Sequence, residues 1–116
     1  MKIAEIIERL DAQVLCGQSR TQTEIDSAFG SDMMSDVLAF VTENTVLLTG
    51  LINVHVIRTA EMLDVSCVVF VRGKPIPEEI IHAADELGMT IMTTRDTLYV
   101  TCGKLFAAGL PGCTRK

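Results

Sequence analysis

The chain is organised around residues 28–40, which read Ala-Phe-Gly-Ser-Asp-Met-Met-Ser-Asp-Val-Leu-Ala-Phe. This pattern predicts a sharp turn at Gly30 that opens a short helix, because glycine tolerates backbone conformations that a β-carbon penalises. Ser31 or Asp32 is then placed to cap the helix, since a side-chain oxygen there accepts a hydrogen bond from an unpaired backbone amide. Apolar residues at helical spacing predict a buried stripe, formed by Met33, Met34, Val37, Leu38, Phe40 and Val41.

On both sides of this segment, short β-rich runs alternate with amphipathic runs at helical spacing. The predicted strands cover residues 13–16, 25–29, 45–49, 66–71 and 90–93. The predicted helices cover residues 2–10, 33–41, 54–63, 77–87 and 98–108. Alternating strands and helices imply parallel strands joined by right-handed crossovers. We therefore expect one α/β domain over residues 1–116, a three-layer α/β/α sandwich with a small, mostly parallel sheet.

Capping residues and apolar positions predict a last helix followed by a tail. Asp96 or Thr97 is expected to cap the last helix, and Gly109 to end it. The tail from residue 110 to residue 116 is expected to be frayed. The predicted apolar side of the last helix consists of Leu98, Val100, Leu105 and Phe106.

Charge and hydropathy limit the partners. With 10 basic and 15 acidic side chains the net charge is −5, which disfavours a nucleic-acid partner because phosphate contacts need a basic face. Hydrophobic residues make up 48% of the chain, yet no apolar run approaches the ~18 residues that span a bilayer. The first residues lack the layout of a signal peptide. We expect a cytoplasmic protein with no membrane partner, whose apolar surface is partly covered by a second copy of itself.

Open parallel sheets bind ligands at the carboxyl ends of their strands. Helix starts and cations at this edge are suited to hold a phosphate, a carboxylate or an adenine nucleotide. The alternative is that capped helices and polar loops occur at this edge in any such domain, and the absence of a glycine-rich phosphate fingerprint favours it. Polar residues predicted here are Ser31, Asp32, Thr49, Gly50, Asn53, Arg72, Lys74, Thr93, Thr94 and Arg95, and all except Thr93 form the candidate ligand site.

Metal and cofactor sites are not expected. His55 and His82 are too isolated for a zinc pair and are expected on helix surfaces. The cysteines contain no close ligand spacing, so we expect reduced thiols, with the one in the tail exposed. Asp32 and Asp36 lie four residues apart and share a helix face, but two carboxylates alone are a weak Mg²⁺ site. The four cysteines are Cys16, Cys67, Cys102 and Cys113.

Three stretches resemble the DRTGG domain. They are residues 30–39, with the Ser-Asp-x-x-Ser-Asp-Val motif, residues 46–53, and residues 68–75. Shorter matches include Glu78-Glu79 and the closing Cys-Gly-Lys-Leu at residues 102–105. In the family, the residues that give it its name lie just before this motif. Here residues 24–29 contain no Asp-Arg and no glycine pair.

The resemblance implies an α/β module similar to the amino-terminal domain of HPr kinase/phosphatase, without the kinase active site. DRTGG domains occur beside CBS domains in regulated pyrophosphatases and within some phosphotransacetylases, where they are regulatory or dimer-forming. Stand-alone versions occur near hydrogenase or redox genes, which implies a redox or metabolic enzyme as partner. The resemblance implies no catalytic residue.

Three hypotheses follow. The first is a non-catalytic regulatory or assembly module that acts as a homodimer, through the helix at 33–41 or through residues 98–110. The second is a small-ligand sensor that binds an anion or adenine nucleotide at the edge of the sheet. The third is a metal-assisted enzyme built on Asp32 and Asp36, which lacks a nucleophile and a base partner.

Overall fold

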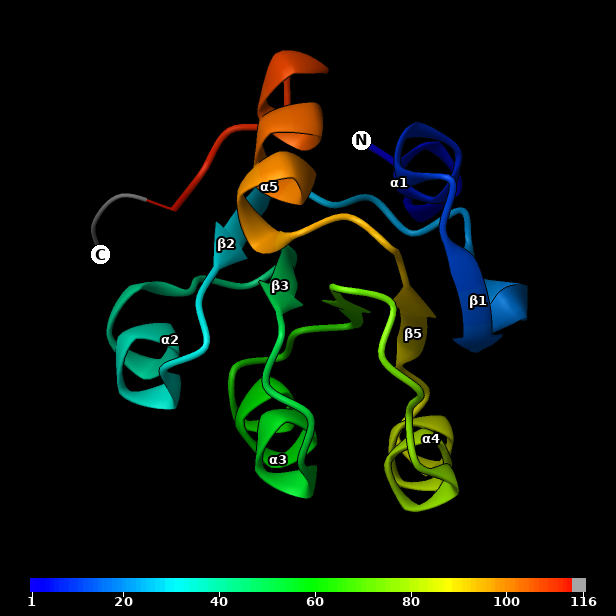
Figure 1. Ribbon diagram of the computed structural model, residues 1–116. Coiled ribbons are helices and arrows are strands. Elements are labelled where there is room, and N and C mark those ends of the chain that lie inside the picture. Colours follow the sequence, from blue (N-terminus) through cyan, green and yellow to red (C-terminus); the bar gives the residue numbers. More distant parts are fainter. Residues whose placement is uncertain (114–116) are drawn as a thin grey trace.

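The computed structural model describes residues 1–113, and residues 114–116 lie outside the described part of the chain. A sheet in the order β1-β5-β4-β3-β2 lies between two layers of helices, with α1 and α5 on one face and α2, α3 and α4 on the other (Figure 1). The predicted three-layer α/β/α fold is confirmed. The strands are β1 (Gln13–Cys16), β2 (Ser27–Gly30), β3 (Thr45–Thr49), β4 (Cys67–Phe70) and β5 (Thr90–Thr93). The helices are α1 (Ile3–Leu10), α2 (Met34–Phe40), α3 (Val54–Met62), α4 (Glu78–Glu86) and α5 (Leu98–Ala107), with a 3₁₀ turn, η1, at Gln18–Arg20.

Strands β2 to β5 are parallel, whereas β1 runs antiparallel to β5 at one edge of the sheet. The central strands β3 and β4 are completely buried, as expected for strands covered on both faces. Because side chains alternate along a strand, neighbouring residues belong to different cores. Leu47 and Phe70 pack on the side of α2, α3 and α4, while Leu48 and Val69 pack on the side of α1 and α5.

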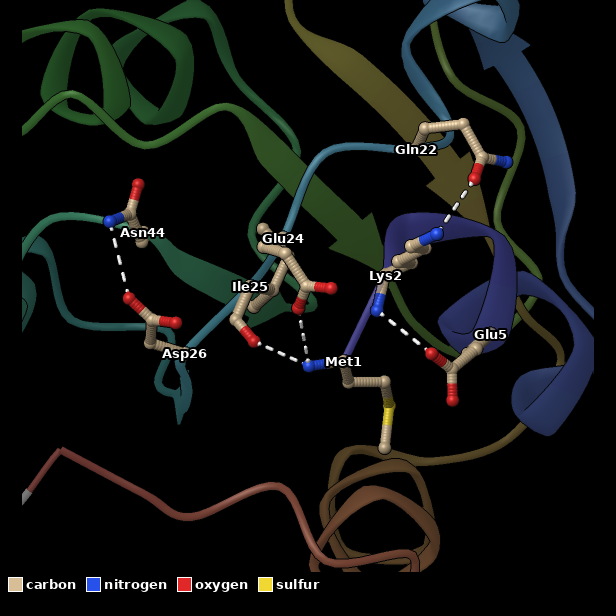
Figure 2. A network of polar contacts seen from close by, with 8 residues as sticks. All are labelled: Met1, Lys2, Glu5, Gln22, Glu24, Ile25, Asp26 and Asn44. Atoms are coloured by element: carbon tan, nitrogen blue, oxygen red, sulfur yellow. Dashed lines mark hydrogen bonds and ion pairs between the residues drawn. The ribbon is translucent and has the colours of Figure 1, made fainter.

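The start of α1 is tied to the segment before β2 (Figure 2). The amino group of Met1 donates to Glu24 Oε2 at 3.1 Å and to the Ile25 carbonyl at 2.9 Å. Lys2 pairs with Glu24 in an isolated antiparallel bridge, and its Nζ donates to Gln22 Oε1 at 3.2 Å. These contacts hold α1 over the face of the sheet that it covers. Within the described residues, no helix is long and apolar enough to cross a bilayer.

The tail was predicted to be frayed, and this is wrong for residues 110–113. Leu110 is only 3% exposed and belongs to the core under α5. The Ala28 amide donates to the Pro111 carbonyl at 2.9 Å, and the Cys113 amide donates to the Ala28 carbonyl at 3.1 Å. Residues 111–113 therefore pair with the edge strand β2. This contact is long-range, so no local sequence pattern predicts it. The rest of the predicted tail, residues 114–116, lies outside the described residues.

The turn at Gly30 also differs from the prediction. Gly30 is the last residue of β2 and does not adopt a left-handed conformation. A β-carbon there would lie 2.5 Å from Cys102 Sγ, so the glycine makes room for α5. Helix α2 begins after Met33, and neither Ser31 nor Asp32 is its N-cap. Ser31 Oγ instead accepts a hydrogen bond from the Met33 amide at 3.0 Å, within the turn.

Both predicted apolar stripes are only partly buried. On α2, Val37 and the following Val41 are buried, but Met33 is 61% exposed. This helix covers the end of the sheet at β2, so only one of its faces meets the core (Figure 1). On α5, Leu105 is buried, whereas Phe106 is 74% exposed. The other predicted stripe residues that are exposed are Leu38, Phe40 and Val100.

Candidate functional site

Asp32 joins the carboxyl ends of β2 and β3. Its Oδ1 accepts hydrogen bonds from the Gly50 amide at 2.7 Å and from Thr49 Oγ1 at 3.1 Å. Thr49 Oγ1 in turn accepts from the Leu51 amide at 3.1 Å. The carboxylate therefore braces two neighbouring loops, a role that a local capping pattern cannot reveal.

Arg72 lies over the same loop. It has a φ of 72°, and its Nη2 donates to the Gly50 carbonyl at 3.1 Å. A β-carbon at Gly50 would come within 2.6 Å of that nitrogen, so the glycine leaves room for the guanidinium. The Arg72 amide donates to the Asp96 carbonyl at 2.8 Å, and the Gly73 amide donates to the Thr94 carbonyl at 2.9 Å. The loops after β4 and β5 are thus held together.

Two further residues of the predicted site have structural partners. Asn53 caps α3, as predicted, by accepting a hydrogen bond from the Val56 amide at 3.3 Å. Thr94 is buried, and its Oγ1 donates to the Leu10 carbonyl at 3.3 Å. Lys74 and Arg95 remain, and within residues 1–113 neither takes part in a salt bridge. The predicted edge therefore has two halves, one braced by internal hydrogen bonds and one that keeps its cations available.

That second half opens into a cleft of about 770 Å³, which we call the β5 cleft. It lies where the end of α1, strand β1 and the loops after β4 and β5 meet. Strand β1 contributes because it is antiparallel, so its first residue, Gln13, pairs with the last residue of β5, Thr93. The lining residues are Leu10, Asp11, Gln13, Leu15, Gly73, Lys74, Pro75, Ile76, Ile81, Thr93, Thr94, Arg95, Asp96 and Lys104.

The prediction missed the contributions of α1, β1 and α5 to this cleft. The available signal was Gln13, a polar residue at the start of an otherwise apolar strand. An assumed parallel β1 would have put Gln13 at the opposite edge of the sheet. Asp11 and Lys104 line the cleft because of the way α1 and α5 pack on the sheet, and no local sequence pattern indicates that packing.

A second hollow, of about 380 Å³, is almost entirely apolar. It lies between α5, β2 and the residues that follow α5. Tyr99 and Phe106 border it and are 87% and 74% exposed. We call this the α5 groove. Its lining is Ala28, Gly30, Leu48, Tyr99, Val100, Cys102, Gly103, Phe106, Leu110 and Gly112.

The four cysteines are free and lie in different environments. Burial raises the pKa of the Cys67 thiol to about 12. Burial opposes ionisation of Cys113 as well, but hydrogen bonds from hydroxyl groups outweigh it and lower the pKa of that thiol. The hydroxyls of Ser27 and Thr45 lie 3.3 Å and 3.4 Å from Cys113 Sγ. Cys113 was predicted to be exposed, but it is partly buried because the tail docks on β2.

Metal-ligating side chains are dispersed over the described residues, where no group of three or more could hold a metal ion. His55 and His82 lie exposed on α3 and α4, as predicted for helix-surface positions. His82 Nε2 is 2.8 Å from Glu86 Oε1, one helical turn away. Asp32 Oδ1, an oxygen of the weak Mg²⁺ pair considered above, already accepts a hydrogen bond from the Gly50 amide.

The mostly parallel sheet with helices on both faces makes this an α/β domain of the three-layer class. The family model for the DRTGG domain matches residues 5–107. The chain belongs to the DRTGG domain family, and the resemblance found in the sequence is confirmed.

Solved structures with a similar fold include a regulatory region with a DRTGG domain. This is the crystal structure of the CBS and DRTGG domains of the regulatory region of Clostridium perfringens pyrophosphatase, complexed with the activator diadenosine tetraphosphate. The TM-score is 0.72 at 19% sequence identity, over 99% of this chain and 51% of that one. The chain thus spans about half the length of that structure, and the likeness concerns the fold. No curated protein matches the chain.

Proposed function

We propose that this chain is a non-catalytic regulatory or assembly module that acts as a homodimer in the cytoplasm. Membership of the DRTGG family supports a regulatory role, because the similar solved structure is the regulatory region of a pyrophosphatase. By analogy, the partner of the module would be a metabolic or redox enzyme.

The observation that carries the homodimer is the apolar surface of α5. Tyr99 is 87% exposed and Phe106 is 74% exposed, and both border the α5 groove. Large apolar side chains grouped around an apolar hollow mark an interaction surface. A stable interface buries roughly 800 Å² per partner, and aromatic residues are enriched in its core. Of the two faces named from the sequence, we favour α5 over α2, because α5 adjoins this groove.

Sedimentation velocity at low micromolar concentration tests this assembly. We expect a species of twice the 12.6 kDa mass of one chain. Phe106→Glu would put a charge into the interface and is expected to give a monomer. Met62→Glu is the matched control, because Met62 on α3 is equally exposed, at 73%, and lies on the other face of the sheet. A monomer for the unmodified chain would refute the homodimer, and dissociation by Met33→Glu alone would move the interface to α2.

The alternative function is a sensor for an anionic small molecule or adenine nucleotide at the carboxyl edge of the sheet. Two observations favour it. Lys74 and Arg95 face the β5 cleft, and neither takes part in a salt bridge within the described residues. In the similar solved structure, the activator is the dinucleotide diadenosine tetraphosphate. Binding of nucleotides to the whole chain, measured by calorimetry, tests the sensor independently of its oligomeric state.

A further inference from the structure

The β5 cleft contains a polar atom without a partner. Thr93 Oγ1 is buried and makes no hydrogen bond with any other described residue. A buried hydroxyl without a hydrogen bond costs about 1–3 kcal/mol, so such groups are rare unless they serve another purpose. Thr93 lines the cleft, where a bound molecule can complete its hydrogen bonding.

The neighbours of Thr93 form a surface with both apolar and hydrogen-bonding character. Gln13 is opposite Thr93 in the register, so the two side chains lie on the same face of the sheet. Leu15 lies two residues further along β1 and shares that face. Ile76 and Ile81 complete an apolar floor on the side of α4. An amide and a hydroxyl beside an apolar floor match a planar ring that has hydrogen-bonding groups on its edge.

The charges around the cleft select an anion of low charge. Lys104 Nζ lies 2.6 Å from Asp96 Oδ2, so these two charges neutralise one another. Lys74 and Arg95 are left as cations, and the Asp11 carboxylate also lines the cleft. One positive charge is thus in excess. This balance suits a monophosphate and opposes a polyphosphate, which would bring several negative charges beside Asp11.

The loops that carry the cations are fixed relative to each other. The Gly73 amide donates to the Thr94 carbonyl at 2.9 Å, immediately before Lys74 on one loop and Arg95 on the other. The loop backbones therefore need not rearrange when an anion binds, and the ordering cost falls on the two side chains. The volume of about 770 Å³ lies within the range typical of small-molecule sites, roughly 300–1,000 Å³.

We propose that the β5 cleft binds a nucleoside monophosphate. The phosphate would contact Lys74 and Arg95, and the base would lie on the apolar floor with its edge at Thr93 and Gln13. This inference rests on the sensor alternative above. It names the class of ligand and places the ligand in the half of the predicted edge that contains Lys74 and Arg95.

Calorimetry on the whole chain tests the proposal with AMP, adenosine and inorganic phosphate as probes. AMP is expected to bind at least about tenfold more tightly than adenosine or phosphate alone, because only AMP engages both parts of the cleft. Equal affinities for AMP and phosphate would overturn the proposal, since the apolar floor would then contribute nothing. Binding of none of the three would overturn the proposal, whereas binding of ATP without binding of AMP would overturn the monophosphate assignment and keep the sensor function.

Variants locate the site. Lys74→Ala and Arg95→Ala are each expected to weaken AMP binding about tenfold, the effect of one charge-assisted hydrogen bond. Arg58→Ala is the control, because Arg58 is an exposed cation on α3 and does not line the cleft. If Arg72→Ala lost AMP binding and Lys74→Ala and Arg95→Ala kept it, the β5 cleft would not be the binding site. The ligand would then bind at the other half of the edge.

Thr93→Val separates a binding role from a structural one. Valine preserves the shape and removes the unpartnered hydroxyl, so the melting temperature is expected to stay the same or to rise. AMP binding is expected to weaken at the same time. Unchanged affinity in Thr93→Val would show that the hydroxyl does not contact the base and would refute that part of the site. The homodimer is measured separately by sedimentation, so its failure leaves these outcomes unaffected.

Discussion

Replacing Gly30 by alanine is expected to destabilise the domain mainly through a clash with Cys102. The added β-carbon would lie 2.5 Å from Cys102 Sγ and 3.3 Å from Leu98 Cδ1. Non-bonded heavy atoms approach to roughly 3.5–4.0 Å, so the sulfur must move by about 1 Å. Overpacking of this kind costs about 1–3 kcal/mol. The backbone of Gly30 is already compatible with alanine, which returns about 0.4–1 kcal/mol through the unfolded state.

The net loss in the free energy of unfolding is therefore expected to be about 1–2 kcal/mol, measured by urea denaturation. The same change in a Cys102→Ala background is expected to be neutral or stabilising, because the sulfur is absent. Gly103→Ala is the control on the neighbouring position of α5. A β-carbon at Gly103 meets nothing within 4 Å, and alanine is the better helix former, so this variant is expected to gain about 1 kcal/mol. An equal loss for Gly30→Ala in both backgrounds would refute the assigned clash.

Three further predictions concern the edge, the tail and a thiol. Asp32→Ala is expected to cost about 1 kcal/mol in urea denaturation, because the Gly50 amide loses its carboxylate acceptor; Asp32→Asn, which keeps an acceptor oxygen, should lose less. Leu110→Ala is expected to cost about 2–3 kcal/mol, as for other buried leucines, and an unchanged midpoint would mean that the tail does not dock. Cys113 is expected to react with iodoacetamide faster than Cys67 in the folded chain, since its pKa lies below the ordinary 9.0 and that of Cys67 above it. The rate at Cys113 should rise with pH and reach half its maximum below pH 9.0, and equal rates at the two thiols would contradict the assignment.

The lowered pKa of Cys113 also has a consequence for stability. A thiol whose pKa is lower in the folded state favours folding when it is ionised. This contribution is present above the pKa of the unfolded thiol and is lost as the pH falls through the folded value. Comparison of the chain with Cys113→Ser between neutral and alkaline pH measures it, and a difference that shrinks as the pH rises would contradict the assignment.

Local sequence patterns were sufficient for most of the secondary structure. The predicted strands at 45–49 and 90–93 coincide with β3 and β5, because continuous β-rich runs bounded by turn residues have few alternatives. The cap at Asn53 was also predicted correctly, since its partner is only three residues away. Where both partners of an interaction are close in sequence, the residue types alone identify it.

The errors concern residues whose partners are far away in the sequence. Gly30 was predicted as a turn residue, but its missing side chain makes room for Cys102. Asp32 was predicted as a helix cap, but its carboxylate accepts a hydrogen bond from the Gly50 amide. The antiparallel direction of β1 depends on the path of the chain around α1, which residues 13–16 do not encode. The candidate site stays a prediction: the sequence placed Lys74 and Arg95 at the carboxyl edge of the sheet, where they line a cleft, but it did not identify Gln13 as their neighbour.

The pairing of Ala28 with residues 111 and 113 has a consequence for solubility. An edge strand with free backbone groups is a template for strands of other chains. In β2, both the amide and the carbonyl of Ala28 are occupied by the end of the same polypeptide. A shortened chain that stops before residue 111 would present these groups to its neighbours, next to the apolar α5 groove. Such a product would be prone to aggregate through β2 even while its two cores remained folded.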